Sequence, residues 1–213
     1  MLKEIISINI GRPIVIEYNG KELKTGLYKK QISEPIYLGK INFAGDAQAD
    51  LIHHGGEDKA VCVYPYEHYI YWEKVLNRKL DNGAFGENLT VKGMVESSVC
   101  IGDIYQISGA KVQVSQPRQP CFKLANRYGD PQLIEKVQTT GYTGYYFKVL
   151  EEGWVNPNDT IELLEKHHLN ITIQFANNIM HHDKENRDAI QEILAVDSLS
   201  ASWRETLTKR LLE

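Results

Sequence analysis

KVQVSQPRQPCFKLA, residues 111–125, joins the end of a strand to the start of a helix and places a thiol between them. Its two valines alternate with polar residues, the period of a half-buried strand. Pro117 and Pro120 cannot donate ladder hydrogen bonds, so we expect the strand to end there. The seven residues that follow Cys121, FKLANRY, read as a short helix of one or two turns. The stretch therefore predicts a strand, a proline turn and a helix, with Cys121 at the junction.

The position of Cys121 makes it a candidate functional thiol. A helix N-terminus presents the positive end of the peptide dipoles, and Arg118 lies three residues away. Both features favour the thiolate, the form that attacks electrophiles and binds soft metals. Most free cysteines are instead small buried packing residues, and the spacing alone leaves both interpretations open. Cys62 and Cys100 lie within apolar strand patterns, and we assign them to packing.

Composition bounds the class of protein. The 213 residues, 42% hydrophobic and 24% charged, suffice for one large domain or one domain with a small appendage. A net charge of -4 argues against nucleic acid as a partner, since such binding needs clustered Lys and Arg. No apolar run is long enough to span a membrane, and residues 1–10 read as a first strand instead of a signal peptide. Three widely spaced cysteines exclude a disulfide scaffold and a zinc ribbon, so we expect a cytoplasmic protein.

The first 165 or so residues predict short strands separated by turns. Asn19-Gly20 is the strongest short hairpin signal in the chain. Two helices interrupt the strands, one from Pro65 to about Leu76 and one from Asp130-Pro131 to about Gln138. Many short strands with frequent turns predict a barrel or a sandwich. The expected strands are residues 5–10, 14–18, 21–25, 60–64, 88–91, 104–107, 111–115, 145–150 and 160–164.

The pattern changes after Lys166, where apolar residues recur at spacings of three and four and predict helices over residues 172–179, 187–194 and 201–212. Asn186 and Ser200 stand where N-caps belong. A module of about 45 residues is too small for a robust core of its own. We therefore expect it to pack against the barrel or against a second subunit in a homodimer. The predicted organisation is a β domain over residues 1–166 and a three-helix module over residues 167–213.

Two glycine-containing segments are weaker candidates for a ligand site. Residues 45–59, GDAQADLIHHGGEDK, contain Gly55-Gly56, which lets backbone N–H groups approach a ligand, and His54, a donor for a phosphate or heterocycle. A well-made turn explains the same residues, and we favour it on the pattern alone. Residues 83–89, GAFGENL, lead into a strand and lack the third glycine of a dinucleotide fingerprint. With no such fingerprint elsewhere, we expect no nicotinamide- or flavin-binding fold.

Six motifs occur in a characteristic order along the chain: residues 45–46 (GD), 54–59 (HGGEDK), 64–69 (YPYEHY), 84–89 (AFGENL), 102–104 (GDI) and 114–121 (VSQPRQPC). Together they resemble the MOSC family, named for the C-terminal domain of molybdenum cofactor sulfurases, and within it the bacterial YiiM-like branch. The resemblance covers nearly the whole chain. It implies a mainly β fold, a MOSC-type β-barrel like the pyruvate kinase insert domain, with peripheral helices and a C-terminal three-helix module.

The resemblance also implies a ligand, the molybdenum cofactor (molybdopterin), in which a pterin carries molybdenum on a dithiolene. The Cys121 thiolate would complete a sulfur-rich coordination sphere around this metal. Arg118 would pair with the phosphate or the pterin, and Asn88 would hydrogen-bond the pterin. Other family members place the arginine directly before the cysteine, whereas two residues intervene here. Further residues expected in the same pocket are Ser115, His54, Gly55 and Gly56.

Similarity to the YiiM-like branch implies reduction of N-hydroxylated compounds, including N-hydroxylated purines such as hydroxylaminopurine, to amines. The redox chemistry would belong to the cofactor, with the protein supplying orientation and electrostatics. Because no flavin or nicotinamide fold is expected, electrons must come from a separate reductase, for which we expect a flavoprotein. Two alternatives stay open: a non-catalytic carrier of the molybdenum cofactor, and a metal-free thiol enzyme that uses Cys121 as its nucleophile.

Overall fold

The framework of the protein, described by a computed structural model over residues 2–18, 20–50 and 55–213, is one large sheet. Its strands are β1 (Glu4–Ile10), β4 (Lys30–Ile32), β6 (Val61–Pro65), β7 (Leu89–Lys92), β8 (Ile104–Ile107), β9 (Ala110–Pro117), β10 (Tyr145–Glu151) and β12 (Ile161–Glu165). They lie in the order β12-β8-β9-β10-β6-β7-β1-β4. β6 and β7 pair in parallel, and the other neighbours pair antiparallel.

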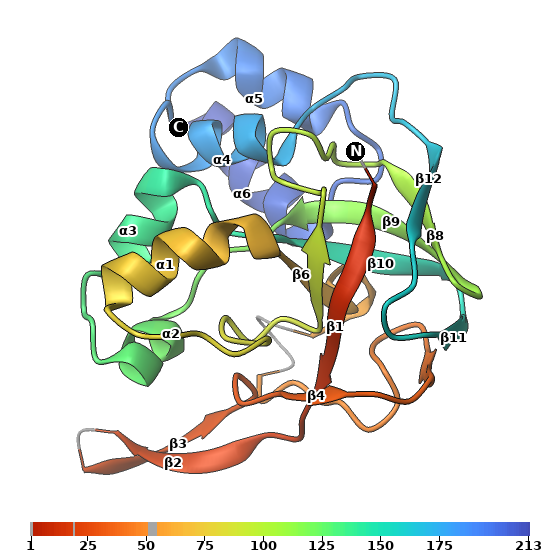
Figure 1. The fold of residues 1–213 in the computed structure, drawn as a ribbon. Helices are drawn as coiled ribbons and strands as arrows, with labels where there is room; N and C mark the ends of the chain where they lie inside the picture. The colour runs from red at the N-terminus through yellow and green to blue at the C-terminus, as the bar shows by residue number, and fades with distance from the viewer. Residues whose placement is uncertain (1, 19, 51–54) are drawn as a thin grey trace.

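The sheet curls so that strands far apart in this order meet. The backbone N–H of Ile5 in β1 donates to the carbonyl of Asp159 at 2.9 Å, and that of Ile161 in β12 donates to the carbonyl of Lys3 at 2.9 Å. These bonds satisfy backbone groups that would otherwise form a free sheet edge. The mainly β barrel fold expected from the sequence is confirmed, and Figure 1 shows β1, β6, β8, β9, β10 and β12 as strands of this sheet.

The interior of the curled sheet is filled by inward-facing aliphatic and aromatic side chains. Alternation along each strand places every second residue inside, so the β-branched runs of the sequence become one continuous core. Fully buried members include Ile8, Val61, Val63, Leu89, Val91, Val112, Val114 and Phe147.

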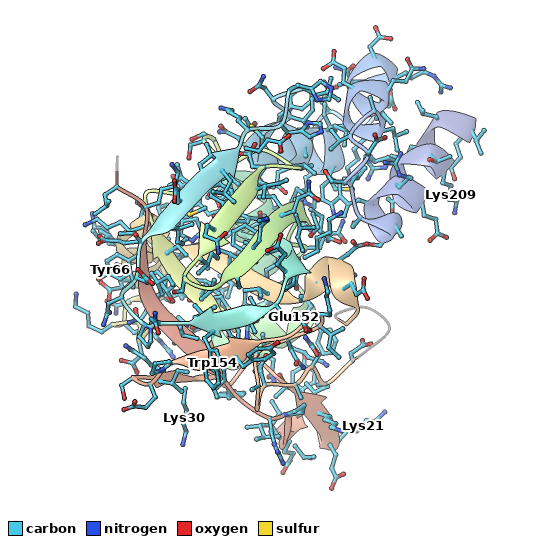
Figure 2. The ribbon with its side chains drawn as sticks, turned by 90° about the vertical axis from the view of Figure 1, so that its right-hand side faces the viewer. Lys21, Lys30, Tyr66, Glu152, Trp154 and Lys209 are labelled. Carbon is cyan, nitrogen blue, oxygen red and sulfur yellow. The ribbon has the colours of Figure 1, made fainter. Side chains whose placement is uncertain are left out.

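Two small sheets lie outside this framework. β2 (Ile14–Tyr18) and β3 (Lys21–Thr25) pair antiparallel with Tyr18 opposite Lys21, as the hairpin signal predicts, although Asn19 itself lies outside the described residues. The hairpin projects from the body of the protein, and its Lys21 lies at the opposite end of the molecule from Lys209 (Figures 1 and 2). The second small sheet joins β5 (Ile36–Leu38) to β11 (Gly153–Val155).

Three helices form a layer on one side of the sheet (Figure 1). They are α1 (Tyr69–Leu76), α2 (Phe122–Tyr128) and α3 (Leu133–Thr140), and they enclose an aromatic cluster of their own. In this cluster Tyr64 stacks on Phe85 with ring centroids 4.2 Å apart, and the Trp72 Nε1–H donates to the Tyr64 hydroxyl at 2.6 Å. The cluster therefore ties α1 to the end of β6 and to the loop that precedes β7.

The three C-terminal helices are α4 (Ile173–His181), α5 (Arg187–Leu194) and α6 (Ala201–Leu212), and the side chains of Thr172, Asn186 and Ser200 cap them. The caps on α5 and α6 are those predicted. The module packs on its own barrel: Ile173 N–H donates to the Val99 carbonyl at 2.9 Å, and the buried apolar residues of all three helices join the core of the sheet. The boundary after Lys166 and a homodimer both stay predictions.

Proline and short strands account for the differences from the predicted elements. Pro65 ends β6 instead of opening a helix, because it pairs with Val91, and a 3-10 turn at Tyr66–His68 precedes α1. β9 continues to Pro117, whose missing N–H is tolerated at a strand end. The very short β4, β5 and β11 carry too few residues for a recognisable alternation. In the described ranges, no helix combines the length and apolar character needed to cross a lipid bilayer.

We predict that His181 makes the protein less stable in acid. Burial first, and then the positive charges of His182, Lys184 and Arg210, lower the pKa of His181 to about 4. Between pH 6.5 and 4 the unfolded chain therefore binds more protons than the folded one, and stability falls as pH falls. Urea unfolding at pH 7 and pH 4.5 measures how much stability each protein loses on acidification. This loss should be smaller in His181→Gln than in the parent by about 1–2 kcal/mol. The control His168→Gln, at an exposed position, should lose nearly as much stability as the parent. An unchanged loss in His181→Gln would contradict the assignment.

Candidate functional site

The candidate site is a cavity of about 620 Å³, counted with the open space at its mouth. It lies where segments distant in the sequence meet: the end of β3 with the loop after it, the loop before η1 (Glu57–Lys59), the start of β6, the loop before β7, and the turn between β9 and α2. Residues with polar or ionisable side chains that line it are Thr25, Lys29, Gln48, Asp50, Lys59, Cys62, Asn88, Arg118, Gln119, Cys121, Lys123 and Tyr146. We call it the main cavity.

Cys121 lines the main cavity as the residue directly before α2. Its backbone is extended, with φ -111° and ψ 157°, and its carbonyl accepts the backbone N–H of Leu124 at 2.9 Å. The chain turns at this residue from the extended proline segment into the helix, which is the junction that the sequence predicts. The side chain is half-buried and makes no capping hydrogen bond, so the sulfur is left for another contact.

Arg118 lies beside Cys121 as a buried cation. It is 5% exposed, and its Nη2 donates to the Phe85 carbonyl at 2.6 Å. Burial acts to lower the pKa of Arg118, but the neighbouring acidic groups, Cys62 foremost, then Tyr146 and Cys121, more than offset it, so the pKa is raised. The guanidinium therefore stays charged, and it places a fixed positive charge beside both thiols of the cavity wall.

The carbonyl that holds Arg118 belongs to a loop organised by Glu87. This carboxylate is fully buried and accepts the backbone N–H groups of Gly83 at 3.2 Å and Phe85 at 2.9 Å, as well as the hydroxyls of Tyr69 and Thr90. Four donors on one carboxylate offset the cost of burying its charge. The 84–89 motif of the sequence is therefore a rigid structural loop that presents the Phe85 carbonyl to Arg118.

Glycine is required at one point of this loop. Gly86 has φ +77°, and a Cβ there would lie 2.5 Å from Cδ2 of Leu27, which also lines the main cavity. The close approach of the loop to the segment after β3 therefore depends on the missing side chain.

A second buried network supports the wall of the main cavity. The Asp46 carboxylate accepts Lys29 Nζ at 2.5 and 2.6 Å, the Gly11 backbone N–H at 2.9 Å and Asn88 Nδ2 at 2.8 Å. Asn88 also donates to the Asn9 carbonyl at 3.3 Å and accepts the Cys62 N–H at 3.1 Å. Asn88 lines the cavity as predicted, but its amide hydrogens are used within the wall, which leaves one lone pair of Oδ1 for a ligand.

The structure brings together Cys121, Arg118 and Asn88 and separates them from the other expected residues. Ser115 is fully buried outside the lining, with its hydroxyl bonded to the Asp58 carbonyl at 2.5 Å and lying 3.2 Å from the Tyr146 carbonyl. Gly55 and Gly56 line a different hollow, between η1 and the start of α6. His54 lies outside the described residues. The roles expected of these residues stay predictions.

Several lining residues were missed by the sequence reasoning. Cys62, assigned there to packing, is buried in strand β6 but also contributes to the wall, and burial raises the pKa of its thiol against the opposing effect of Arg118. Lys59 belongs to a recognised motif, and its pKa is lowered by burial. Lys123 follows Cys121 by two residues and was overlooked, whereas Lys29 carries no local signal, because only the fold brings it into the same cavity wall as Cys121.

The sequence matches two known domains, the first over most of the β domain and the second over the C-terminal helices. Residues 50–162 match the MOSC domain, and residues 171–213 match the YiiM-like, 3-alpha helix domain. The chain belongs to the MOSC family. The first match contains the 84–89 loop, the β9–α2 turn and Cys121, and the second contains all three C-terminal helices.

Relatives extend this membership over the whole chain. Uncharacterized protein YflK of Bacillus subtilis is 53% identical over 206 residues, 97% of this chain and 93% of that protein. The crystal structure of YiiM from Geobacillus stearothermophilus has a TM-score of 0.85 and 41% identity and covers 98% of this chain and 99% of that one. A protein of Gibberella moniliformis named "Reductase" is 38% identical over 69% of this chain, but the match spans only 27% of that protein.

We predict that loss of the Asp46 carboxylate weakens the cavity wall. Asp46→Ala leaves the charge of Lys29 buried without its partner, which costs about 3 kcal/mol of stability. Chemical unfolding of the variant and the parent measures this loss. Lys79→Met, which breaks an exposed ion pair with Glu73, should leave the midpoint unchanged. Equal midpoints for Asp46→Ala and the parent would refute the importance of this network.

Proposed function

We propose that the chain is a molybdenum-cofactor-dependent reductase that converts N-hydroxylated compounds, N-hydroxylated purines among them, to amines. The observation that carries this proposal is the Cys121 thiol in the wall of a cavity that also contains four basic side chains: Lys29, Lys59, Arg118 and Lys123. MOSC family membership and the fungal relative named "Reductase" support it.

The residues of the main cavity fit a ligand that combines a soft metal with an anionic organic part. A cysteine thiolate is the protein ligand that a thiophilic metal prefers. Basic side chains, and above all a planar guanidinium, suit a phosphate or a polar heterocycle. The molybdenum cofactor has this chemistry, so the donor set is compatible with it.

Each residue would have a defined task. Cys121 would ligate the metal, and Arg118, fixed by the Phe85 carbonyl, would hold its charge beside the sulfur without reorganisation. Lys29, anchored by Asp46, would face the anionic end of the ligand, and Asn88 would use its remaining lone pair on the pterin. When bound, the cofactor supplies two-electron chemistry at the N–O bond. R–NHOH takes up two electrons and two protons and yields R–NH2 and water.

The electrons would come from another protein. About 73% of the fungal "Reductase" lies outside the segment that matches this chain. The reductase activity that its name implies can therefore depend on segments of the fungal protein that do not match this chain. This difference in length supports a division of labour in which a separate reductase, a flavoprotein in our proposal, feeds the MOSC protein.

The decisive experiment is turnover by the anaerobically purified protein after loading with the cofactor. We expect hydroxylaminopurine to be reduced with an artificial electron donor such as reduced methyl viologen, and not with NADH alone. Molybdenum analysis of the same sample reads out binding. Bound molybdenum without turnover would favour a cofactor carrier, and unaided turnover with NADH would contradict the need for a separate reductase.

We predict that Cys121→Ser abolishes both molybdenum retention and hydroxylamine reduction while the fold persists, because a half-buried thiol contributes little packing. The matched control is Cys100→Ala, which removes a buried thiol that does not line the main cavity and should retain activity per folded molecule. Far-UV circular dichroism confirms folding in both. The thiol enzyme would be supported instead by a different result: the metal-free parent protein is fully active, and Cys121→Ser abolishes this activity.

A further inference from the structure

A second hollow, of about 1130 Å³ counted with its open space, lies against the main cavity and reaches to α6. We call it the α6 hollow. Its lining includes Gln116 and Gln119 from the segment before Cys121, Phe122 from α2, and from α6 the residues Ser202, Trp203 and Thr206. The C-terminal module thereby takes part in a surface that the MOSC domain alone would leave open.

The two hollows meet at Cys121. Besides Cys121, both are lined by Asp50, Lys59, Gln119 and Tyr146. A molecule in the α6 hollow can therefore place one group beside the sulfur while its remainder stays outside the main cavity. This is the arrangement that a substrate needs when a cofactor occupies the space on the other side of the thiol.

The chemistry of the α6 hollow suits a planar nitrogen heterocycle. Phe122 is 53% exposed and offers an aromatic face on which a ring can stack. Gln119, which is exposed, supplies a side-chain amide that can pair with the adjacent donor and acceptor atoms of adenine-like rings, whereas the buried Gln116 amide already bonds to the Pro117 carbonyl and to Ser202. Ser202 and Thr206 add hydroxyl oxygens that can accept from a ligand, since their hydrogens are donated to Gln116 Oε1 and to the Ser202 carbonyl.

Trp203 supplies an independent sign of a missing polar partner. The residue is 2% exposed and lines the α6 hollow, and its Nε1–H finds no hydrogen-bond partner in the described part of the chain. A buried donor left unpaired destabilises the folded state, because it has lost its hydrogen bond to water and gained none in return. Because Nε1 itself is sealed from solvent, the indole must shift toward the hollow before a ring nitrogen or an exocyclic oxygen of a ligand can accept this hydrogen bond.

The position of α6 is fixed by the same strand that leads to Cys121. The backbone N–H of Ser200 donates to the Ser115 carbonyl in β9 at 3.1 Å, and that of Ala201 donates to Asp58 Oδ2 at 3.1 Å. The Ser202 hydroxyl donates to Gln116 Oε1 at 3.3 Å. The α6 wall is therefore held in a defined register with the β9–α2 turn.

We infer that the α6 hollow holds the heteroaromatic ring of the substrate, and that side chains of α6 determine which rings the protein accepts. The inference rests on the proposed function and adds to it a specificity site in the three-helix module. A purine-sized ring would contact α6 while its hydroxylamino group faces Cys121. A small alkyl hydroxylamine would reach Cys121 without contacting α6.

The first test compares Thr206→Leu with Thr208→Leu, an exposed position on the same helix that does not line the hollow. With cofactor-loaded protein and an artificial donor, kcat/KM is measured for 6-hydroxylaminopurine and for N-methylhydroxylamine. Thr206→Leu should lower the purine-to-methyl ratio at least tenfold, and Thr208→Leu should keep it within twofold. A ratio unchanged in Thr206→Leu would overturn the inference and leave the proposed function standing.

The second test needs neither cofactor nor turnover. Calorimetric titration with adenine should show binding to the parent protein that weakens at least tenfold in Thr206→Leu and several-fold in Trp203→Phe, which keeps an aromatic ring but removes the N–H. Thr208→Leu should bind as the parent does. Loss of reduction of both hydroxylamines by the parent would refute the proposed function, whereas equal adenine affinity in all four proteins would refute the α6 site.

Discussion

The site depends on one buried charge, the guanidinium of Arg118. A cation that is 5% exposed is tolerated only where acceptors and acidic groups surround it, and here the Phe85 carbonyl and the neighbouring thiols do so. To meet this requirement, the turn after β9 and the loop before β7 must hold a single relative position. That position in turn fixes Cys121, three residues along the chain, at the boundary of two hollows.

Two buried carboxylates maintain this geometry through hydrogen bonds to the residues that form the cavity wall. Glu87 holds the loop that carries the Phe85 carbonyl, and Asp46 holds Lys29 and Asn88 in the cavity wall. Both carboxylates accept several donors each, so both networks are rigid in a low-dielectric setting. The wall can therefore present positive charge to a ligand without the large rearrangement that flexible surface lysines would need.

The barrel and the helical module make different contributions to this site. The barrel and its loops supply the thiol and the basic side chains, which suit a cofactor shared across a family. The module joins the same hydrophobic core and brings α6 against the β9–α2 turn. Chemistry and ring recognition would then lie in parts of the chain that match separate domains, which allows one to change without the other.

Much of the fold could be predicted from the sequence, because it depends on local interactions. Hairpin β2–β3, the caps Asn186 and Ser200 and the junction at Cys121 depend on residues a few positions apart, so their patterns predict them. The motifs also indicated the family. Tertiary structure decided which residues line the main cavity, because Lys29 lines the same cavity as Cys121, 92 residues further along, only after the sheet has curled. The same packing turned Ser115 and the Gly55-Gly56 turn away from the main cavity, since a hydroxyl bonded to a buried carbonyl lies within the wall whatever its motif suggests.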